Sequence, residues 1–185
     1  LLEAVANTFK IELSVSESAD TILFDYDHGL SVPLIVPPLH RVKSAPTLNV
    51  IGSKVLRFGM VDGDAVVKAD FVVYDPQSAH SPTLFRANGS DAKRLVIVCN
   101  RREVFLLTGE EDVGVAAAKL RAQDQAEAVI VKCGSHGALL VSDSGQQHIP
   151  AFQTNRVWPL GSGDIFAAAF FACWAHFGQP IAEAS

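Results

Sequence analysis

From residue 47 onward, short continuous runs of β-branched and other apolar residues alternate with helical patterns, and this alternation constrains the fold more than any other feature. The runs expected to form strands are TLNVIG (47–52), DFVVYDP (70–76), RLVIVCN (94–100) and AEAVIVKCG (126–134). Such runs are typical of parallel strands that are covered on both faces. Helical patterns occur in REVFLLTG (102–109) and in the alanine-rich EEDVGVAAAKLRAQDQ (110–125). The sequence therefore predicts an α/β domain with a largely parallel central sheet flanked by helices.

The segments on either side of this pattern indicate antiparallel pairing. GALLVSDSGQQHIPAF (137–152) predicts two strands around a Ser-Gly turn. Near the start of the chain, FKIEL (9–13) alternates like a short strand, and TILFDYDHGLSVPLIV (21–36) has the pattern of a hairpin. We therefore expect residues 1–45 to form a small β flap with its connection, as part of an incomplete domain, and residues 46–185 to form the α/β core.

Composition excludes several classes of protein. Hydrophobic residues make up 49% of the 185 residues and charged residues 19%, which is typical of globular chains. The net charge is −5 and no Lys/Arg-rich run occurs, so a nucleic-acid partner is not expected. No uncharged run reaches the roughly 18 residues of a membrane span, and no signal peptide is visible. The three cysteines lack a C-x-x-C pair, which favours reduced thiols and a cytoplasmic location.

The two ends of the sequence carry a further expectation. The chain begins Leu-Leu without a Met and stops at Ser185, in what has the pattern of a helix just beginning. We therefore expect that pieces are missing at both ends.

The stretch Gly161-Ser162-Gly163-Asp164 is the first candidate for chemistry. Two glycines let backbone N–H groups crowd together, and a following helix adds its unpaired N–H groups and positive dipole end, so the stretch predicts an anion-binding pocket. A carboxylate there would weaken anion binding unless it removes a proton from an attacking hydroxyl. The alternative is that Asp164 only caps the helix. The helix itself, IFAAAFFACWAHF (165–177), is apolar all round, which predicts that it is buried.

Two further groups of residues permit chemistry but have simpler explanations. Asn100 closes a strand and Glu103 follows one helical turn later, so the pair could hold a magnesium water shell or a phosphate, or could merely cap a helix. Lys132, Gly134 and Gly137 lie in a turn between two strands, where they could contact a nucleotide phosphate or form a plain hairpin turn. The Walker A pattern is absent.

The order of these motifs is more specific than any one of them. The chain contains, in this order, Asn-x-x-Glu, Thr-Gly, Val-Lys-x-Gly-x-x-Gly and Gly-x-Gly-Asp, the last of them before an apolar helix. This order resembles the carboxyl-terminal half of the PfkB (ribokinase-like) sugar and nucleoside kinases, and the resemblance runs from about Leu95 to Phe177. Upstream, ADFVVYDPQ (69–77) looks like a family strand that ends in Asp-Pro. The hairpin pattern of the flap is similar to the family's lid over the substrate, although it rests on pattern only.

The resemblance implies a ribokinase-like α/β fold and a kinase that transfers the γ-phosphoryl group of ATP to a hydroxyl of a small sugar, polyol or nucleoside. It makes residues 46–185 a nucleotide-binding and catalytic core. Asp164 would be the catalytic base on the acceptor hydroxyl. The anion hole would be formed by Gly161, Ser162 and Gly163.

The same resemblance implies roles for the other candidates. Asn100 and Glu103 would position Mg²⁺, through water, and the phosphates. Lys132, Gly134 and Gly137 would line the nucleotide site. The implied cofactors are thus ATP and Mg²⁺, and a homodimer through the flap is a further expectation because exposed hairpin edges invite pairing.

The sequence departs from the family pattern in three places. The smallest departure is Ser162, where the family has Ala in its glycine motif. Where the family has Asp-Thr ahead of its glycines, this chain has Trp158-Pro159, so activation by a monovalent cation is not expected. The amino-terminal Gly-Gly segment and the substrate-binding Asp of the family have no match, so the acceptor contacts are not assigned. Two alternatives stay open: a ligand-binding or regulatory protein of the same fold with little catalysis, and a vitamin kinase of the same superfold.

Overall fold

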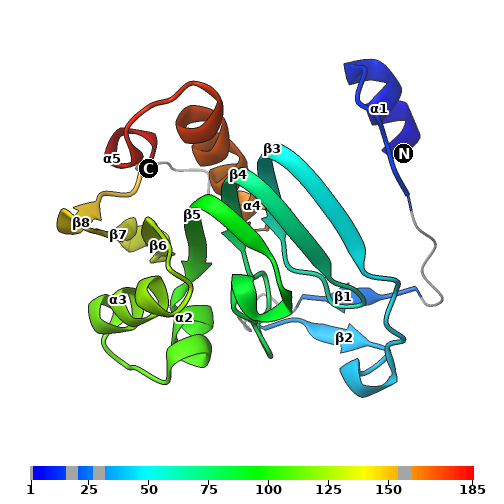
Figure 1. Ribbon diagram of the computed structural model, residues 1–185. Coiled ribbons are helices and arrows are strands. Elements are labelled where there is room, and N and C mark those ends of the chain that lie inside the picture. The colour runs from blue at the N-terminus through cyan, green and yellow to red at the C-terminus, as the bar shows by residue number, and fades with distance from the viewer. Residues whose placement is uncertain (1, 16–20, 27–31, 154–159) are drawn as a thin grey trace.

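The computed structural model describes residues 2–15, 21–26, 32–153 and 160–185. Within these residues, six strands form one sheet in the order β3-β4-β5-β6-β7-β8 (Figure 1). The strands are β3 (Leu48–Phe58), β4 (Ala65–Asp75), β5 (Asp91–Asn100), β6 (Ala128–Lys132), β7 (Ala138–Ser142) and β8 (Gly145–Ile149). The order follows the sequence, so each strand pairs with the next along the chain. The predicted α/β fold with a largely parallel sheet is confirmed.

The direction of the strands sets where their ends meet. β3, β4, β5 and β6 are parallel to one another, with Leu56 beside Val73 and Val98 beside Ile130. β7 is antiparallel to β6, and β8 is antiparallel to β7, as the Ser-Gly turn between β7 and β8 predicted. The carboxyl ends of four successive parallel strands therefore lie at one edge of the sheet, which is where open α/β sheets bind ligands.

Helices cover the two faces of the sheet. α2 (Arg101–Thr108) and α3 (Val113–Gln123) bury Val104 and Leu120 against one face. α4 (Ser162–Phe171) and the π-helical turn η4 (Ala172–His176) bury Phe170 and Trp174 against the other. The continuous apolar runs of the central strands are thus explained by cover on both faces. α5 (Ile181–Ala184) follows at the end of the chain.

The amino-terminal region contains one confirmed and one wrong prediction. β1 (Leu23–Asp25) and β2 (Leu34–Val36) pair antiparallel, as the hairpin pattern predicted, although residues 27–31 between them lie outside the described residues. FKIEL was predicted to be a strand, but Phe9 ends helix α1 (Leu2–Phe9). Lys10 has a left-handed φ of 55°, and the Ile11 N–H donates to the Ala6 carbonyl at 2.8 Å, which closes a helix end. Alternation over five residues does not specify a strand when no described strand pairs with them.

α4 is less buried than its composition predicted. Ala167 and Phe170 are buried against the sheet, but Ile165 on the same helix is 72% exposed. The prediction of a helix buried all round is therefore wrong for the described part of the chain, because hydrophobicity does not say whether a second covering layer is present. No helix among the described residues has both the length and the apolar character needed to cross a membrane.

Candidate active site

A cavity of about 760 Å³ lies at the carboxyl edge of the parallel strands. Its volume is within the range of small-molecule sites, about 300–1,000 Å³. The strand ends contribute Asp75 from β4, Asn100 from β5 and Lys132 from β6. The other lining residues that carry the argument below are Gly59, Asp62, Gln77, Glu103, Gly161, Gly163 and Asp164. The topology therefore brings the predicted motifs together, although they are far apart in the sequence.

Asp164 lies at the start of α4, and it does not cap that helix. The N-cap residue is Gly161, with a left-handed φ of 79°, and no side chain caps the first turn. Asp164 is the third residue of the helix, and its Oδ1 accepts a hydrogen bond from Nε2 of Gln77. A helix start carries the positive end of the helix dipole, which favours an anion there. Ser162, unlike the two glycines beside it, does not line the cavity.

Lys132 and Asp75 form an ion pair within the cavity. The Lys132 Nζ lies 2.5 Å from Asp75 Oδ2, and Asp75 is fully buried. Burial raises the pKa of the Asp75 carboxyl, although the ammonium of Lys132 opposes the shift. A Cβ on Gly163 would lie 3.1 Å from the Lys132 Nζ, so the second glycine of the motif lets the helix start pack close to this lysine.

Gln77 is a site residue that the sequence analysis missed. Its backbone N–H donates to Asp75 Oδ1 at 3.2 Å, and its side-chain amide donates to Asp164. Its φ of 47° lies in the left-handed region, which is uncommon for residues other than glycine. The only local signal was its place two residues after the Asp that ends a strand.

Asn100 and Glu103 form a complete capping box at the start of α2. The Asn100 Oδ1 accepts from the Glu103 N–H at 2.9 Å, and Glu103 Oε2 accepts from the Asn100 N–H at 2.8 Å. Glu103 is only 3% exposed, and burial raises its pKa, while the hydrogen bond from the Asn100 backbone opposes the shift. The capping explanation is therefore confirmed, and both residues also line the cavity.

These two residues fit a water-mediated magnesium site better than direct ligation. Their oxygens are the hard donors that Mg²⁺ takes, and Mg²⁺ usually keeps several waters. Glu103 Oε2 and Asn100 Oδ1 are already engaged in the capping box, which leaves their remaining lone pairs for water. Across residues 2–15, 21–26, 32–153 and 160–185, no group of three or more His, Cys, Asp or Glu side chains forms a metal cage.

Gly134 and Gly137 do not line the cavity. They belong to the turn from β6 to β7, where the Cys133 N–H donates to the Gly137 carbonyl at 2.7 Å. A Cβ on Gly137 would lie 1.9 Å from the Ile149 carbonyl oxygen, so close backbone approach explains this glycine. A nucleotide contact for the two glycines stays a prediction.

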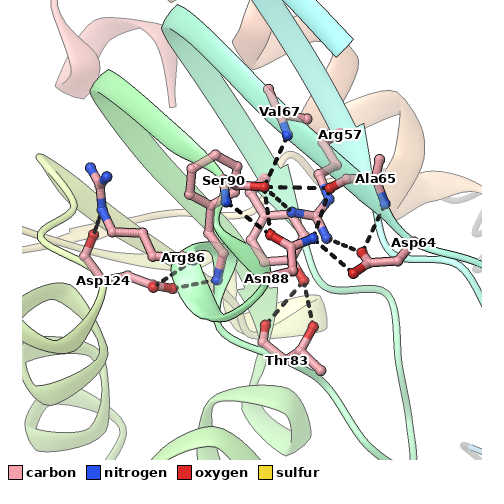
Figure 2. A network of polar contacts seen from close by, with 11 residues as sticks. Arg57, Asp64, Ala65, Val67, Thr83, Arg86, Asn88, Ser90 and Asp124 are labelled. Atoms are coloured by element: carbon pink, nitrogen blue, oxygen red, sulfur yellow. Dashed lines mark hydrogen bonds and ion pairs between the residues drawn. The ribbon is translucent and has the colours of Figure 1, made fainter. Parts of the chain in front are cut away.

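A polar network fixes one wall of the cavity. Six residues, 59–64, join β3 to β4, whereas parallel neighbours usually need a dozen or more. Near the two ends of this connection, Arg57 and Asp64 form an ion pair at 2.7 Å, and the side chain of Arg57 is almost fully buried. Asn88 Nδ2 donates to Asp64 at 2.7 Å, and Arg57 donates to Ser90 at 3.2 Å (Figure 2). The network holds the connection, whose first four residues line the cavity.

The flap contributes to the same cavity. Ile22, Phe24 and Tyr26 line it, and Phe24 also lines a neighbouring cavity of about 480 Å³ together with Ile35. In the picture, β1 and β2 lie next to β3 and β4, while α1 stands apart (Figure 1). This position is compatible with the predicted lid.

Comparison with known proteins agrees with this geometry. Residues 64–185 match the profile of the pfkB family carbohydrate kinases, which is more than half of the chain. This chain belongs to the pfkB family. It is 33% identical over 90 residues to a cytidine kinase from Thermococcus kodakarensis, covering 48% of this chain and 32% of that protein. It is 36% identical over 84 residues to a deoxyribokinase from Salmonella typhi, covering 43% of this chain and 26% of that protein.

A solved structure supports the fold as well. A ribokinase from Thermotoga maritima is similar, with 30% identity and a TM-score of 0.52 over 61% of this chain and 38% of that chain. The present pfkB chain thus spans about a third of the length of the relatives that it matches. The match includes Asp75, Asn100, Lys132 and Asp164, while the flap precedes it. Trp158-Pro159, where the family has Asp-Thr, lies outside the described residues.

Proposed function

We propose that this chain carries the catalytic half of an ATP-dependent kinase that phosphorylates a hydroxyl of a small sugar, polyol or nucleoside. The observation that supports this most is the place of Asp164. Its carboxylate is in the cavity at the strand ends, held by Gln77, on the first turn of α4. A base beside an anion site is what transfer to an alcohol needs.

The reaction follows from this arrangement. The acceptor hydroxyl gives its proton to Asp164 as its oxygen forms a bond to the γ-phosphorus of ATP, and the bond from that phosphorus to the β,γ-bridging oxygen breaks. The products are the phosphorylated acceptor, ADP and a proton on the carboxyl group. Backbone N–H groups of Gly161 to Gly163 and the helix dipole stabilise the charge on the moving group. Positioning and electrostatics supply most of the rate.

The charges around the cavity support a need for a divalent cation. Among the described residues that line it, Asp62, Asp75, Glu103 and Asp164 are acidic and Lys132 alone is basic. Such a cavity would repel the phosphates of ATP unless a cation came with them. Bound Mg²⁺ would supply the missing positive charge. Asn100 and Glu103 would hold its water shell, and activation by a monovalent cation is not expected.

The nucleotide is proposed to lie near the start of β7, with Lys132 on its phosphates and the Gly134–Gly137 turn beside it. Since Lys132 is already paired with Asp75, its ammonium is fixed in direction, which suits a point charge aimed at a phosphate. The flap closes over the acceptor as a lid. A cytoplasmic location stays a prediction from the reduced cysteines.

A homodimer through the flap is part of the proposal. On the face of β1 and β2 that is turned away from the cavity, Leu23, Leu34 and Val36 are exposed. Apolar residues on a two-stranded sheet invite a partner surface. Sedimentation of the chain at micromolar concentration is expected to give twice the monomer mass, and a monomeric mass would contradict this part alone.

The test is acceptor-dependent conversion of ATP to ADP in the presence of Mg²⁺, with a pooled set of sugars, polyols and nucleosides. Asp164→Asn is expected to lower kcat by about 10²–10⁴-fold because it removes the base, while ATP binding is retained. Asp70→Asn is the matched control, since Asp70 lies in an exposed ion pair with Lys93 away from the cavity. ATP binding without turnover for any acceptor would favour a ligand-binding protein, and turnover on hydroxymethyl-pyrimidine or pyridoxal would favour a vitamin kinase.

A further inference from the structure

Gln77 connects the two carboxylates of the cavity. Its backbone N–H donates to Asp75 Oδ1, and its side-chain Nε2 donates to Asp164 Oδ1, which is 87 residues away along the chain. We propose that Gln77 is a positioning residue that holds the Asp164 carboxylate toward the acceptor hydroxyl, with buried Asp75 as its anchor. The catalytic part of this inference rests on the proposed function, whereas the contact itself does not.

The anchor is rigid because its own partners are fixed. Asp75 is fully buried at the end of β4, and Lys132 on β6 holds its Oδ2 at 2.5 Å. Its Oδ1 is then left to accept the Gln77 N–H at 3.2 Å. The ends of β4 and β6, which lie on either side of β5, therefore fix the backbone of Gln77 from one side. Asp164, in contrast, is exposed on a helix turn and has freedom of rotation without such a contact.

The backbone of Gln77 is itself unusual. A φ of 47° places it in the left-handed region, where a residue with a Cβ is strained. Glycine would adopt this conformation without strain, yet glycine has no side chain to reach Asp164. Strained positions of this kind are kept where the surroundings enforce them and are frequent at functional sites. The conformation directs the amide across the cavity edge to Asp164.

The chemistry of the amide suits this task. The side-chain NH₂ group of glutamine can donate to a carboxylate but cannot take up its proton. It therefore occupies Oδ1 of Asp164 and leaves Oδ2 as the oxygen that receives the proton from the acceptor. A carboxylate at position 77 would repel Asp164 instead.

The first experiment compares two glutamines in the same backbone conformation. Gln77→Gly removes the amide and relieves the left-handed strain, so the variant is expected to fold. Gln125→Gly is the matched control, because Gln125 also has a left-handed φ, 50°, and is exposed at the end of α3, away from the cavity. Gln77→Gly is expected to lower kcat by about 10–100-fold, since a misplaced reacting group costs about that much, with the KM for ATP within about twofold. Gln125→Gly is expected to leave both unchanged.

A conservative variant separates orientation from packing. Gln77→Glu keeps the size of the side chain but replaces the donor by a charge, and it is expected to lose as much kcat as Gln77→Gly. If Gln77→Gly or Gln77→Glu retained kcat within about twofold while Asp164→Asn was inactive, the positioning role would be refuted and the proposed function would stand.

The second experiment needs no turnover. The side-chain amide signals of Gln77 and Gln125 are measured by ¹H–¹⁵N NMR on the whole chain, with and without Asp164→Ala. We expect the Gln77 NH₂ signals alone to shift and to exchange faster with water in the variant. Unchanged Gln77 signals would refute the contact whatever the activity. A confirmed contact in a wild-type chain without kinase activity would refute the proposed function and, with it, the catalytic role of Gln77.

Discussion

Gly59 is the residue at which a single methyl group should disturb the cavity most. It follows β3 and lies against the turn after β4, where its N–H donates to the Asp75 carbonyl at 2.8 Å. A Cβ at position 59 would lie 1.8 Å from the Pro76 carbonyl oxygen and 2.6 Å from the Pro76 carbonyl carbon. Both atoms belong to the backbone, so no flexible side chain can give way.

The size of the effect follows from these distances. Real Cβ contacts are not found below 3.0 Å, so Gly59→Ala must separate two backbone segments by about 1.2 Å, from 1.8 Å to 3.0 Å. The ion pair of Arg57 with Asp64 ties one of these segments, and the buried Asp75 ties the other. Overpacking of this kind costs about 1–3 kcal/mol. For a chain of this size, the melting temperature should fall by about 2–12 °C.

The same displacement should lower activity. Pro76 lies between Asp75 and Gln77, so the shift moves the anchor of the proposed base, and a misplacement of about 1 Å can cost about 10²-fold in rate. Gly52→Ala, within β3, is the control, because its Cβ would meet only Val55 Cγ2, at an ordinary 3.5 Å. Replacing glycine by alanine inside a strand is expected to stabilise by about 0.5–1 kcal/mol. The assay is thermal unfolding followed by circular dichroism, with kcat beside it. Equal melting temperatures for the two variants would refute the reasoning.

Two further predictions concern buried carboxylates. Lys132→Met leaves the buried Asp75 carboxylate without its cation and should lower the free energy of unfolding by about 3–5 kcal/mol, measured in urea at neutral pH. The decrease should be smaller in acid, because Asp75 then takes up a proton. A decrease below about 1 kcal/mol at neutral pH would contradict the role of the ion pair. Burial raises the pKa of Glu103 above the ordinary 4.5, so the folded state binds this proton more tightly than the unfolded state. The stabilisation from this tighter proton binding is present below pH 4.5 and is lost as the pH rises through the folded-state pKa. In urea titrations, the free energy of unfolding of the wild type relative to Glu103→Gln should therefore fall with rising pH. A rise with pH would contradict a raised pKa for Glu103.

The fold could be predicted where the sequence signal is local. β4, β5 and β6 are continuous apolar runs because both of their faces are covered, and α2 is bounded by its capping box and by Gly109. β3 extends to Phe58, beyond its predicted end at residue 52, because an edge strand can expose Ser53 and Lys54 to solvent. The uncovered face of α4 could not be predicted, since an apolar sequence is the same whether or not a second layer packs on it.

The site residues could likewise be predicted only where the sequence signal is local. Asp164, Asn100 and Glu103 could be found because each belongs to a short motif, and the structure brings all three to one cavity. The role of Gln77 could not be found, because its partner Asp164 is 87 residues away and no local rule predicts the contact. Asp75 was visible as a strand end before proline, but its partner Lys132 lies 57 residues further on, and only the order of the strands brings the two together.

The reversal of direction at β7 has a practical consequence. β7 begins with Ala138 beside Lys132, at the edge with the cavity, and ends with Ser142 beside Ala128 at the opposite edge. The turn that follows, with Asp143 and its mostly exposed side chain, is therefore a sheet length away from the chemistry. Exposed turns tolerate insertion well. A fluorophore or an affinity tag grafted at this turn would report on the chain, or immobilise it, while the strand ends stay open to small molecules.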